Sequence, residues 1–244
     1  MADSANAPEE NKGITSLNGN IYFDVMSWLH NYLDPQTYFE IGTNKGHSLN
    51  LAKCRSIAVD PSFGGPTEPA GKRPVTMYFQ MKSDDFFKEY NPKALFNAEV
   101  DLAFLDGLHE AETLLRDFYN TEMYCKKNSI ICIHDCVPTN TSMLTRAHNG
   151  SFWTGDVWKV LSILKEYRPD LNIYVFDAPP TGLVVCTNLD PQSKLLEENY
   201  WDIWRKWSRI DLESYGYDRF IEQCEIISTS KLRTAEEMRR FFWL

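Results

Sequence analysis

The residues best suited to chemistry begin at a glycine-bearing turn early in the chain. Residues 40–48 read EIGTNKGHS, and they place Gly42 and Gly46 directly after the β-type run Thr37–Ile41. Glycines in such a turn let the backbone bend tightly and approach a ligand where a Cβ atom would clash. A helix expected over Gly46–Lys53 would direct its free N–H groups to the same place. The segment predicts a small-molecule binding site.

An acidic residue stands where it would complete this site. Asp60 comes twenty positions after Glu40, at the end of a second predicted strand, Ser56–Val59. A carboxylate there can accept both hydroxyls of a ribose. The glycine spacing differs from G-x-G-x-x-G and leaves no place for a pyrophosphate. The acidic site therefore suits a ligand with ribose, adenine and a cationic, phosphate-free tail, which is the character of S-adenosylmethionine. A tight loop without a ligand is the alternative.

Further candidate residues follow two later strands. Asp106 and His109 come after the predicted strand Val100–Leu105, and Asp135 comes after the predicted strand Ser129–Ile133. Ligands of an open α/β sheet bind outside the carboxyl ends of its strands, so the chemistry should lie there. An imidazole is well suited to removing a hydroxyl proton near neutral pH. The alternative for His109 is that it only begins the helix that follows it.

The elements that position these residues alternate between strand and helix. The predicted strands are Thr37–Ile41, Ser56–Val59, Val75–Phe79, Val100–Leu105, Ser129–Ile133, Asn172–Phe176 and Leu183–Thr187. The predicted helices are Ile21–Leu33, Gly46–Lys53, a helix capped near Ser83, Glu110–Cys125 and Asp156–Tyr167. The connection between the last two strands is too short for a crossover, so they should form an antiparallel hairpin.

This alternation predicts an α/β fold. We expect a Rossmann-like, mainly parallel seven-stranded sheet with helices on both faces and a terminal antiparallel hairpin. The chain divides into a flexible N-terminal tail (1–19), an α/β domain (20–188) and a helical C-terminal extension (189–244).

Composition excludes several classes of function. The net charge of −9 and the absence of a Lys/Arg cluster argue against a nucleic-acid partner. No apolar run reaches the roughly 18 residues of a membrane span, and the N-terminus lacks the apolar segment of a signal peptide. The six cysteines show neither CxxC nor zinc-finger spacing, which favours a reducing compartment. We expect a cytoplasmic protein that acts on a small molecule. Homo-oligomer formation is left open.

Three motifs resemble those of a known family. The run Thr37–Pro61 resembles the first two motifs of class I S-adenosylmethionine-dependent methyltransferases. Residues 104–109 (FLDGLH) and 131–136 (ICIHDC) resemble the small-molecule O-methyltransferase branch, which includes catechol O-methyltransferase and the macrocin O-methyltransferase type that modifies sugars. The resemblance covers about Ile21–Thr187. It implies an enzyme that methylates a hydroxyl of a sugar or diol-like acceptor, with 20–188 as the methyltransferase domain.

The resemblance also implies roles for individual residues. Cofactor-binding residues would be Glu40, Gly42, Thr43, Gly46, Ser48, Asp60, Ser83, Asp84 and Asp106. In the family the first turn holds the methionine end of the cofactor, the acid after the second strand binds the ribose, and Ser83 and Asp84 would lie beside the adenine. Asp106 and Asp135 would bind Mg²⁺, and His109 would be the general base, with Asp106 beside it in catalysis.

The second metal motif departs from the family pattern. The third ligand in the family is an Asp or Asn beside the second, whereas here His134 precedes Asp135 and Cys136 follows it. Because alternate side chains of a strand face opposite ways, we expect that these three residues do not converge on one ion.

Other residues receive structural interpretations. Lys45, His47 and Lys53 are taken as solvated or packing residues. The tryptophans at helical spacing, Trp201, Trp204 and Trp207, predict one apolar stripe, while Trp153 and Trp158 fit the core slightly better than the roof of an acceptor pocket. Three alternative functions stay open: an NAD-dependent oxidoreductase, a non-catalytic methyltransferase-like module, and methyl transfer to nitrogen.

Overall fold

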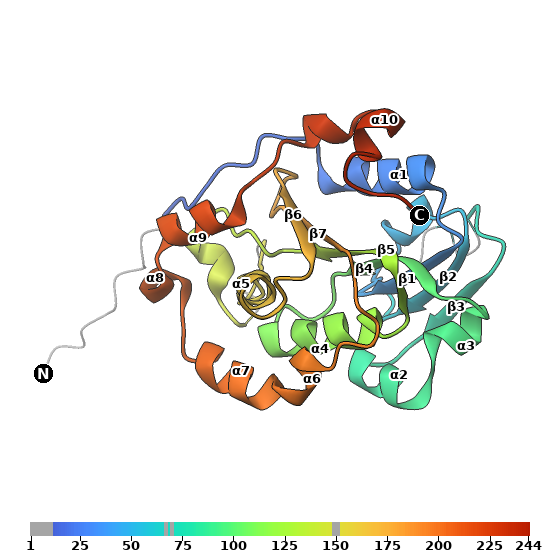
Figure 1. Cartoon of the computed structure of the whole chain (residues 1–244), viewed down its shortest axis with the longest axis horizontal. Helices are drawn as coiled ribbons and strands as arrows, with labels where there is room; N and C mark the ends of the chain where they lie inside the picture. The colour runs from blue at the N-terminus through green and yellow to red at the C-terminus, as the bar shows by residue number, and fades with distance from the viewer. Residues whose placement is uncertain (1–11, 66–67, 69–70, 148–151) are drawn as a thin grey trace, which may run out of the picture.

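A computed structural model describes residues 12–65, 68, 71–147 and 152–244. They form a seven-stranded sheet of order β3-β2-β1-β4-β5-β7-β6. The strands are β1 (Thr37–Ile41), β2 (Arg55–Val59), β3 (Thr76–Phe79), β4 (Val100–Leu105), β5 (Cys125–His134), β6 (Asn172–Phe176) and β7 (Leu183–Thr187). Strands β1 to β5 pair in parallel, and β7 is antiparallel to β5 and β6. The predicted sheet and its terminal hairpin are confirmed (Figure 1).

Helices cover both faces of this sheet. They are α1 (Tyr22–Leu33), α2 (Ser83–Glu89), α3 (Pro92–Phe96), α4 (Ala111–Glu122), α5 (Trp158–Tyr167), α6 (Leu195–Glu198), α7 (Tyr200–Trp207), α8 (Leu212–Tyr215), α9 (Tyr217–Cys224) and α10 (Ala235–Met238). Short 3₁₀ turns are η1 (Leu49–Leu51), η2 (Thr141–Leu144) and η3 (Thr229–Leu232). In Figure 1, α1 and α10 lie on one side of the sheet, and α4, α5 and α7 lie on the other.

The sheet separates two buried apolar clusters. Phe39 and Ile41 of β1 belong to the cluster under α4 and α5, whereas Tyr38 belongs to the cluster under α1 and α10. Successive side chains of a strand point to opposite faces, so one short strand supplies both clusters. Strands β1 and β4 are buried along their whole length, as strands covered on both faces should be. Ligand-binding side chains must therefore come from the strand ends and the loops.

One predicted helix is wrong. Of the range Gly46–Lys53, only the three residues of η1 are helical, in a single 3₁₀ turn. Gly46 has φ +74°, which is outside the right-handed helical region, and Ala52 is already extended as the chain turns into β2. The remaining residues are too few for a helix. The turn after β1 therefore has no helix N-terminus beside it.

The two ends of the chain pack against the sheet domain. Residues 1–11 of the predicted tail lie outside the described residues, but Gly13 forms a β-bridge with Asn140, and Gly19 N–H donates to the Asp177 carbonyl at 3.0 Å. In the C-terminal segment, Trp207 contributes to one apolar cluster and Met238 to the other. The division into tail, domain and extension stays a prediction.

The tryptophan stripe is only partly present. Trp207 is 2% exposed, whereas Trp201 is 73% exposed. Steps of three residues fall about 60° short of a helical turn, so the first and third tryptophan point in different directions. The buried face of α7 is made by Tyr200, Ile203 and Trp207.

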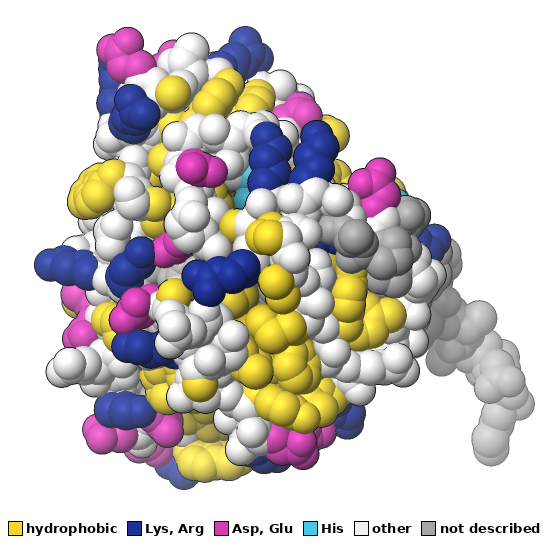
Figure 2. Space-filling view, turned by 90° about the vertical axis from the view of Figure 1, so that its right-hand side faces the viewer, with side chains coloured by type: hydrophobic (Ala, Val, Ile, Leu, Met, Phe, Trp, Pro, Cys, Tyr) yellow, Lys and Arg dark blue, Asp and Glu magenta, His cyan; other side chains and the backbone are white. Residues whose placement is uncertain are grey.

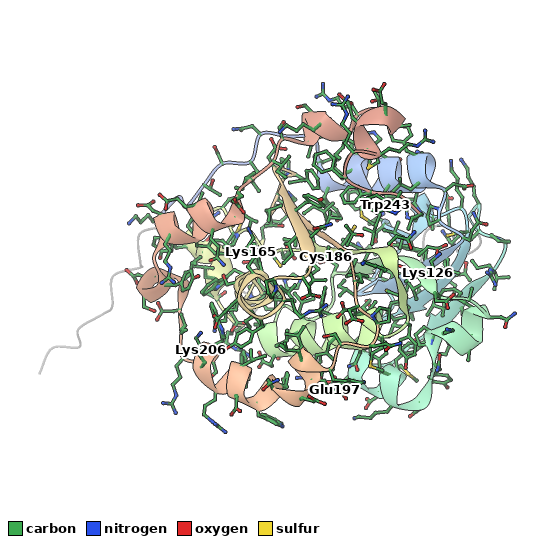
Figure 3. All side chains as sticks on the ribbon, viewed as in Figure 1. Lys126, Lys165, Cys186, Glu197, Lys206 and Trp243 are labelled. Atoms are coloured by element: carbon green, nitrogen blue, oxygen red, sulfur yellow. The ribbon has the colours of Figure 1, made fainter. Side chains whose placement is uncertain are left out.

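Charged side chains lie on the surface of the molecule, and the cysteines lie in its interior. On the face of the molecule beside β2 and β3, charged side chains of both signs are interspersed (Figure 2). All six cysteines are free and buried, and Cys186 lies in the interior, while Lys206 and Glu197 lie at the periphery (Figure 3). Within the described ranges, no helix combines the length and apolarity that crossing a bilayer requires.

Candidate active site

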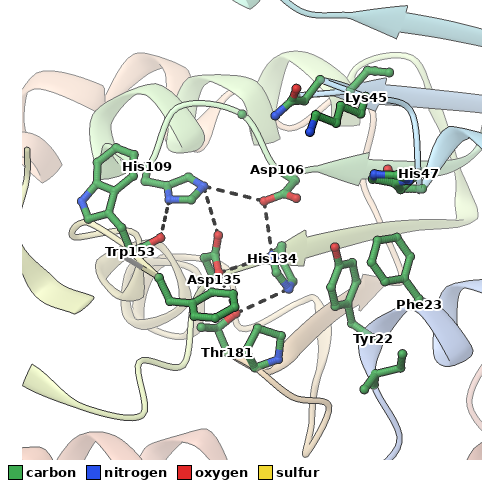
Figure 4. A pocket seen from close by; sticks show the side chains of 18 of the residues that line it. Tyr22, Phe23, Lys45, His47, Asp106, His109, His134, Asp135, Trp153 and Thr181 are labelled. Atoms are coloured by element: carbon green, nitrogen blue, oxygen red, sulfur yellow. Dashed lines mark hydrogen bonds and ion pairs between the residues drawn. The ribbon is translucent and has the colours of Figure 1, made fainter. Parts of the chain in front are cut away.

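A cavity of about 860 Å³ opens at the carboxyl ends of β1, β4 and β5 (Figure 4). Its lining comes from the turn after β1, the ends of β4 and β5, the start of α1, and two loops. The lining residues are Ile21, Tyr22, Phe23, Gly42, Thr43, Asn44, Lys45, His47, Ser48, Asp106, Gly107, His109, His134, Asp135, Phe152, Trp153, Pro179, Pro180 and Thr181. The glycine turn after β1 and the aspartates and histidines at the ends of β4 and β5 thus line one cavity.

Gly42 is required by the backbone of β4. Its φ is +87°, and a Cβ atom at this position would lie 1.9 Å from the carbonyl oxygen of Asp106. The Gly42 N–H donates to the Val59 carbonyl at 2.9 Å, and the Asp106 N–H donates to the Ile41 carbonyl at 2.9 Å. These contacts fix the turn against the start of the loop that carries Asp106.

Asp60 holds the turn from its other side. One carboxylate oxygen accepts the Asn44 N–H at 2.7 Å, and the other accepts the Ser62 N–H at 2.7 Å. The residue is 8% exposed and is not among those lining the cavity. Each carboxylate oxygen can accept a second hydrogen bond. In this structure the carboxylate is used to order the turn.

Glu40 lies buried beneath the same turn. The Tyr38 hydroxyl donates to its Oε2 at 2.5 Å. Within the described chain, neither Oε1 of Glu40 nor the hydroxyl of Thr43 has a partner at hydrogen-bond geometry. Burial raises the pKa of Glu40 to about 7, although the hydroxyls of Tyr38, Thr43 and Ser48 favour the charged form. Two buried polar groups with spare capacity therefore lie under the turn.

Ser83 and Asp84 are not brought to the cavity. Asp84 accepts two hydrogen bonds from the Arg116 guanidinium, both at 2.8 Å. Ser83 is the first residue of α2 and does not cap it; the position before α2 is Lys82, whose side chain makes no capping bond. The Ser83 hydroxyl instead hydrogen-bonds to Asp117, whose burial raises its pKa to about 7.

The ends of β4 and β5 bring two carboxylates and two imidazoles together. Nε2 of His109 lies 3.0 Å from Asp135 Oδ2 and 3.8 Å from Asp106 Oδ1. Nδ1 of His134 lies 3.3 Å from Asp106 Oδ1 and 3.3 Å from Asp135 Oδ1. The Thr181 hydroxyl donates to Asp135 Oδ1 at 2.6 Å. Figure 4 shows this acid–imidazole cluster, formed by Asp106, His109, His134 and Asp135, at the floor of the cavity.

A backbone feature explains why His134 and Asp135 face the same way. Strand β5 ends at His134, and Asp135 has φ +61°, in the left-handed region. This conformation interrupts the alternation of the strand, so both side chains reach Asp106. The three consecutive residues do not converge on one point, as expected, but the residue that faces away is Cys136 and not Asp135. Cys136 points away, and its buried Sγ lies 3.6 Å from the Val157 carbonyl oxygen.

The charges of the cluster stabilise one another. Burial lowers the pKa of His134, but Asp135 and Asp106 outweigh it and raise that pKa to about 10. Burial likewise opposes the charged form of Asp106, and the two imidazoles outweigh it, so its pKa falls below the usual range. For His109 the two carboxylates also outweigh burial and raise the pKa. At neutral pH His134 is an imidazolium between two carboxylates.

His109 is oriented by the loop that precedes α5. Its Nδ1 donates to the Trp153 carbonyl at 2.7 Å, which leaves Nε2 facing the carboxylates. The Trp153 ring stacks on the imidazole at 4.6 Å. A Cβ at Gly155, with φ +56°, would lie 1.9 Å from the His109 carbonyl oxygen, so glycine permits this close approach. Trp153 thus lines the cavity, whereas Trp158 lies in the core.

Several cavity residues had no signal in the sequence. Thr181 contacts Asp135 across 46 residues of sequence. His134 stands beside Asp135 in the sequence, but its contact with Asp106, 28 residues away, was not expected. Lys45 and His47, taken as solvated or packing residues, both line the cavity and are exposed, while Lys53 does not line it. Tyr22, Phe23, Phe152 and Trp153 give the cavity aromatic walls.

Comparisons with known proteins agree with this geometry. Residues 39–136, from β1 to just after β5, match the family model described as a methyltransferase domain. No curated protein matches the sequence. The fold is similar to that of the O-methyltransferase TomG from Streptomyces achromogenes, solved with S-adenosylmethionine, at 13% identity and a TM-score of 0.53, covering 68% of this chain and 78% of that one.

Two further solved structures have the same fold. An O-methyltransferase from Bacillus cereus, bound to S-adenosylhomocysteine, gives 11% identity and a TM-score of 0.51, covering 68% of this chain and 79% of its own. The Podospora anserina methyltransferase PaMTH1, also bound to S-adenosylhomocysteine, gives 16% identity and a TM-score of 0.50, covering 69% and 78%. Residues 39–136 therefore match a methyltransferase-domain model, and the chain shares the fold of these three methyltransferases.

Proposed function

We propose that this chain, with its methyltransferase domain, transfers the methyl group of S-adenosylmethionine to a hydroxyl of a sugar or diol-like small molecule. The observation that carries the proposal is that one cavity of about 860 Å³ is lined by both the turn after β1 and the acid–imidazole cluster. Ligand pockets of this size accommodate a small molecule together with its cofactor. A nucleic-acid or membrane partner is not part of the proposal.

The residues under the turn fit the cofactor. Oε1 of Glu40 and the hydroxyl of Thr43 are buried polar atoms with no partner at hydrogen-bond geometry in the described chain, and such atoms are costly unless a ligand satisfies them. An ammonium group is the donor that a carboxylate accepts most strongly. We assign the methionine end of the cofactor to Gly42, Thr43, Gly46 and Ser48 above Glu40, and the ribose to the side of Asp60.

His109 is proposed as the general base. When bound, the cofactor supplies a sulfonium methyl group that an oxygen nucleophile can take. The Trp153 carbonyl holds the Nδ1 proton of His109, so Nε2 is the atom that accepts the proton of the acceptor hydroxyl. The resulting imidazolium lies 3.0 Å from Asp135 and is stabilised by its charge. The methyl–sulfur bond breaks as the methyl–oxygen bond forms, and the proton stays on His109.

Asp106 and Asp135 are proposed to hold a divalent cation. Ligand atoms of these carboxylates and of His134 lie within 4.8 Å of one another. Mg²⁺ prefers oxygen ligands, so the two carboxylates suit it better than the imidazole of His134, with waters and acceptor oxygens completing its shell. Such a cation lowers the pKa of a hydroxyl bound to it.

The test is a turnover assay with a panel of diols, sugars and phenols, following S-adenosylhomocysteine release with and without EDTA. We expect turnover with at least one hydroxyl acceptor, loss of turnover in EDTA, and recovery with Mg²⁺. If EDTA leaves turnover unchanged, the proposed cation is wrong and the proposed methyl transfer still stands. If calorimetry finds no binding of S-adenosylmethionine or S-adenosylhomocysteine, the whole proposal fails.

The competing functions are tested in the same experiments. The methyltransferase family match favours this function over an NAD-dependent oxidoreductase, for which NADH should bind and quench tryptophan fluorescence. Cofactor binding without turnover on any acceptor, of oxygen or nitrogen, would support a non-catalytic module.

A further inference from the structure

Lys45 is a cationic side chain without a partner in the described chain, and it lies at the mouth of the cavity. It is the one Lys or Arg among the described lining residues, and no hydrogen bond or ion pair engages it. Its stem is held in place by Gly64, where an added Cβ would lie 2.9 Å from Lys45 Cγ. Figure 4 shows Lys45 and His47 on one side of the cavity, away from His109 and Trp153.

The turn after β1 offers an anion no helix N-terminus. The predicted helix over Gly46–Lys53 is absent, so no set of free helical N–H groups faces the cavity. Three N–H groups of the turn are already used: Gly42 donates to the Val59 carbonyl, Asn44 to Asp60, and Gly46 to the Thr43 carbonyl. The N–H groups of Thr43, Lys45, His47 and Ser48 have no acceptor in the described chain, so an anion beside this turn has backbone donors as well as the ammonium group of Lys45.

The charges around the turn favour a side-chain cation beside the carboxylate of the cofactor. Glu40, Asp60 and Asp106 surround it with carboxylates, an environment that favours the ammonium and sulfonium groups of the proposed cofactor and opposes its carboxylate. The methionine end carries both signs of charge. A positive side chain offsets this repulsion of the carboxylate, and Lys45 is the one Lys or Arg among the described lining residues.

We propose that the ammonium group of Lys45 binds the α-carboxylate of the methionine end of the cofactor. This inference rests on the proposed function, since it assumes S-adenosylmethionine as the cofactor. It assigns Lys45 a binding role in place of the solvated role that the sequence indicates. His47 is exposed on the same side of the cavity, and its imidazole is a second donor beside the Lys45 ammonium group.

Calorimetry with two ligands tests this assignment. S-adenosylhomocysteine carries both the ammonium and the carboxylate, whereas its decarboxylated analogue keeps the ammonium and lacks the carboxylate. The variant Lys45→Met should bind S-adenosylhomocysteine about tenfold more weakly, as expected for losing an exposed charge-assisted hydrogen bond. Its affinity for the decarboxylated analogue should change less than about twofold, and Lys45→Arg should retain most of the affinity for both.

The control is Lys53→Met, on the same β1–β2 connection. The Lys53 amine donates to Asn31 Oδ1 at 2.6 Å and does not line the cavity, so neither affinity should change. Unchanged binding of the decarboxylated analogue also reports that Lys45→Met is folded. Equal weakening of both ligands, or no weakening of either, would overturn the role of Lys45 and leave the proposed function standing. A wild-type protein that binds neither ligand would overturn both.

Discussion

The two halves of the cavity are built by different parts of the chain. The half after β1 is a backbone structure: Gly42 touches the carbonyl of Asp106, and Asp60 accepts two backbone N–H groups. The half after β4 and β5 is a side-chain structure, in which two imidazoles lie against two carboxylates. A steric change should therefore disrupt the first half, and a change of charge should disrupt the second.

The largest effect is expected from Gly42→Ala. The new Cβ would lie 1.9 Å from the Asp106 carbonyl oxygen, so the turn must leave the end of β4. We expect S-adenosylhomocysteine binding to be lost and the free energy of unfolding to fall by about 2–3 kcal/mol. Calorimetry and urea denaturation measure the two quantities.

Gly65→Ala is the matched control for this clash. Gly65 has a similar φ of +79°, but a Cβ there meets no atom of the described residues within 4 Å. Its substitution should cost only the left-handed backbone strain, about 1 kcal/mol, with ligand binding retained. If Gly42→Ala and Gly65→Ala behaved alike, the close contact between the turn and β4 would not be what positions the cofactor half.

His109→Ala should have the next largest effect, on rate and not on binding. Loss of the base should lower kcat by about 10²–10⁴-fold. Affinity for S-adenosylhomocysteine should change little, because the cofactor half does not depend on the His109 side chain. Steady-state assays and calorimetry on the same variant measure both. A large loss of cofactor affinity at unchanged kcat would reverse the assignment of the two halves.

The strands of the sheet are the part of the fold that sequence could predict best. Strands Thr37–Ile41, Val100–Leu105, Asn172–Phe176 and Leu183–Thr187 have the bounds expected from their apolar runs. These runs are short, bounded by turn residues and buried on both faces, so local pattern and tertiary environment agree. The helix expected after Gly46 failed because the positive φ of that glycine is set by the turn and has no periodic signature.

The side-chain half could be predicted only in part. Asp106, His109 and Asp135 follow strand ends that parallel pairing must bring to one edge, and the structure places His109 Nε2 3.8 Å from Asp106 and 3.0 Å from Asp135. The contributions of His134 and Thr181 depend on the left-handed conformation of Asp135 and on a loop 46 residues away. No local pattern encodes such contacts.

The pH dependence of turnover should sharpen the role of charge in this half. Nε2 of His109 accepts a proton only when it is neutral, and the neighbouring carboxylates raise the pKa of His109 above 6.5 despite burial. Turnover should therefore decline as the pH falls through this raised pKa. Asp135→Asn removes one negative charge, lowers that pKa and moves the acid limb of the kcat/KM profile to lower pH, measured at saturating Mg²⁺ because Asp135 is also a proposed cation ligand. If the acid limb of the profile stays at the same pH in Asp135→Asn, a group other than His109 sets the pH dependence of turnover.

The smallest effect is expected from Asp84→Asn, which distinguishes the resemblance from the observed contacts. The resemblance places Asp84 beside the adenine, whereas here its carboxylate is paired with Arg116 at 2.8 Å and does not line the cavity. The pair is partly exposed, so the substitution should lower the free energy of unfolding by about 1 kcal/mol or less. Affinity for S-adenosylhomocysteine should stay within about twofold, because a neutral amide can still accept one hydrogen bond from Arg116 and keep α2 in place. A tenfold loss of affinity without a loss of stability would instead return Asp84 to the cofactor site, and the region after β3 would then join the turn as part of the cofactor half.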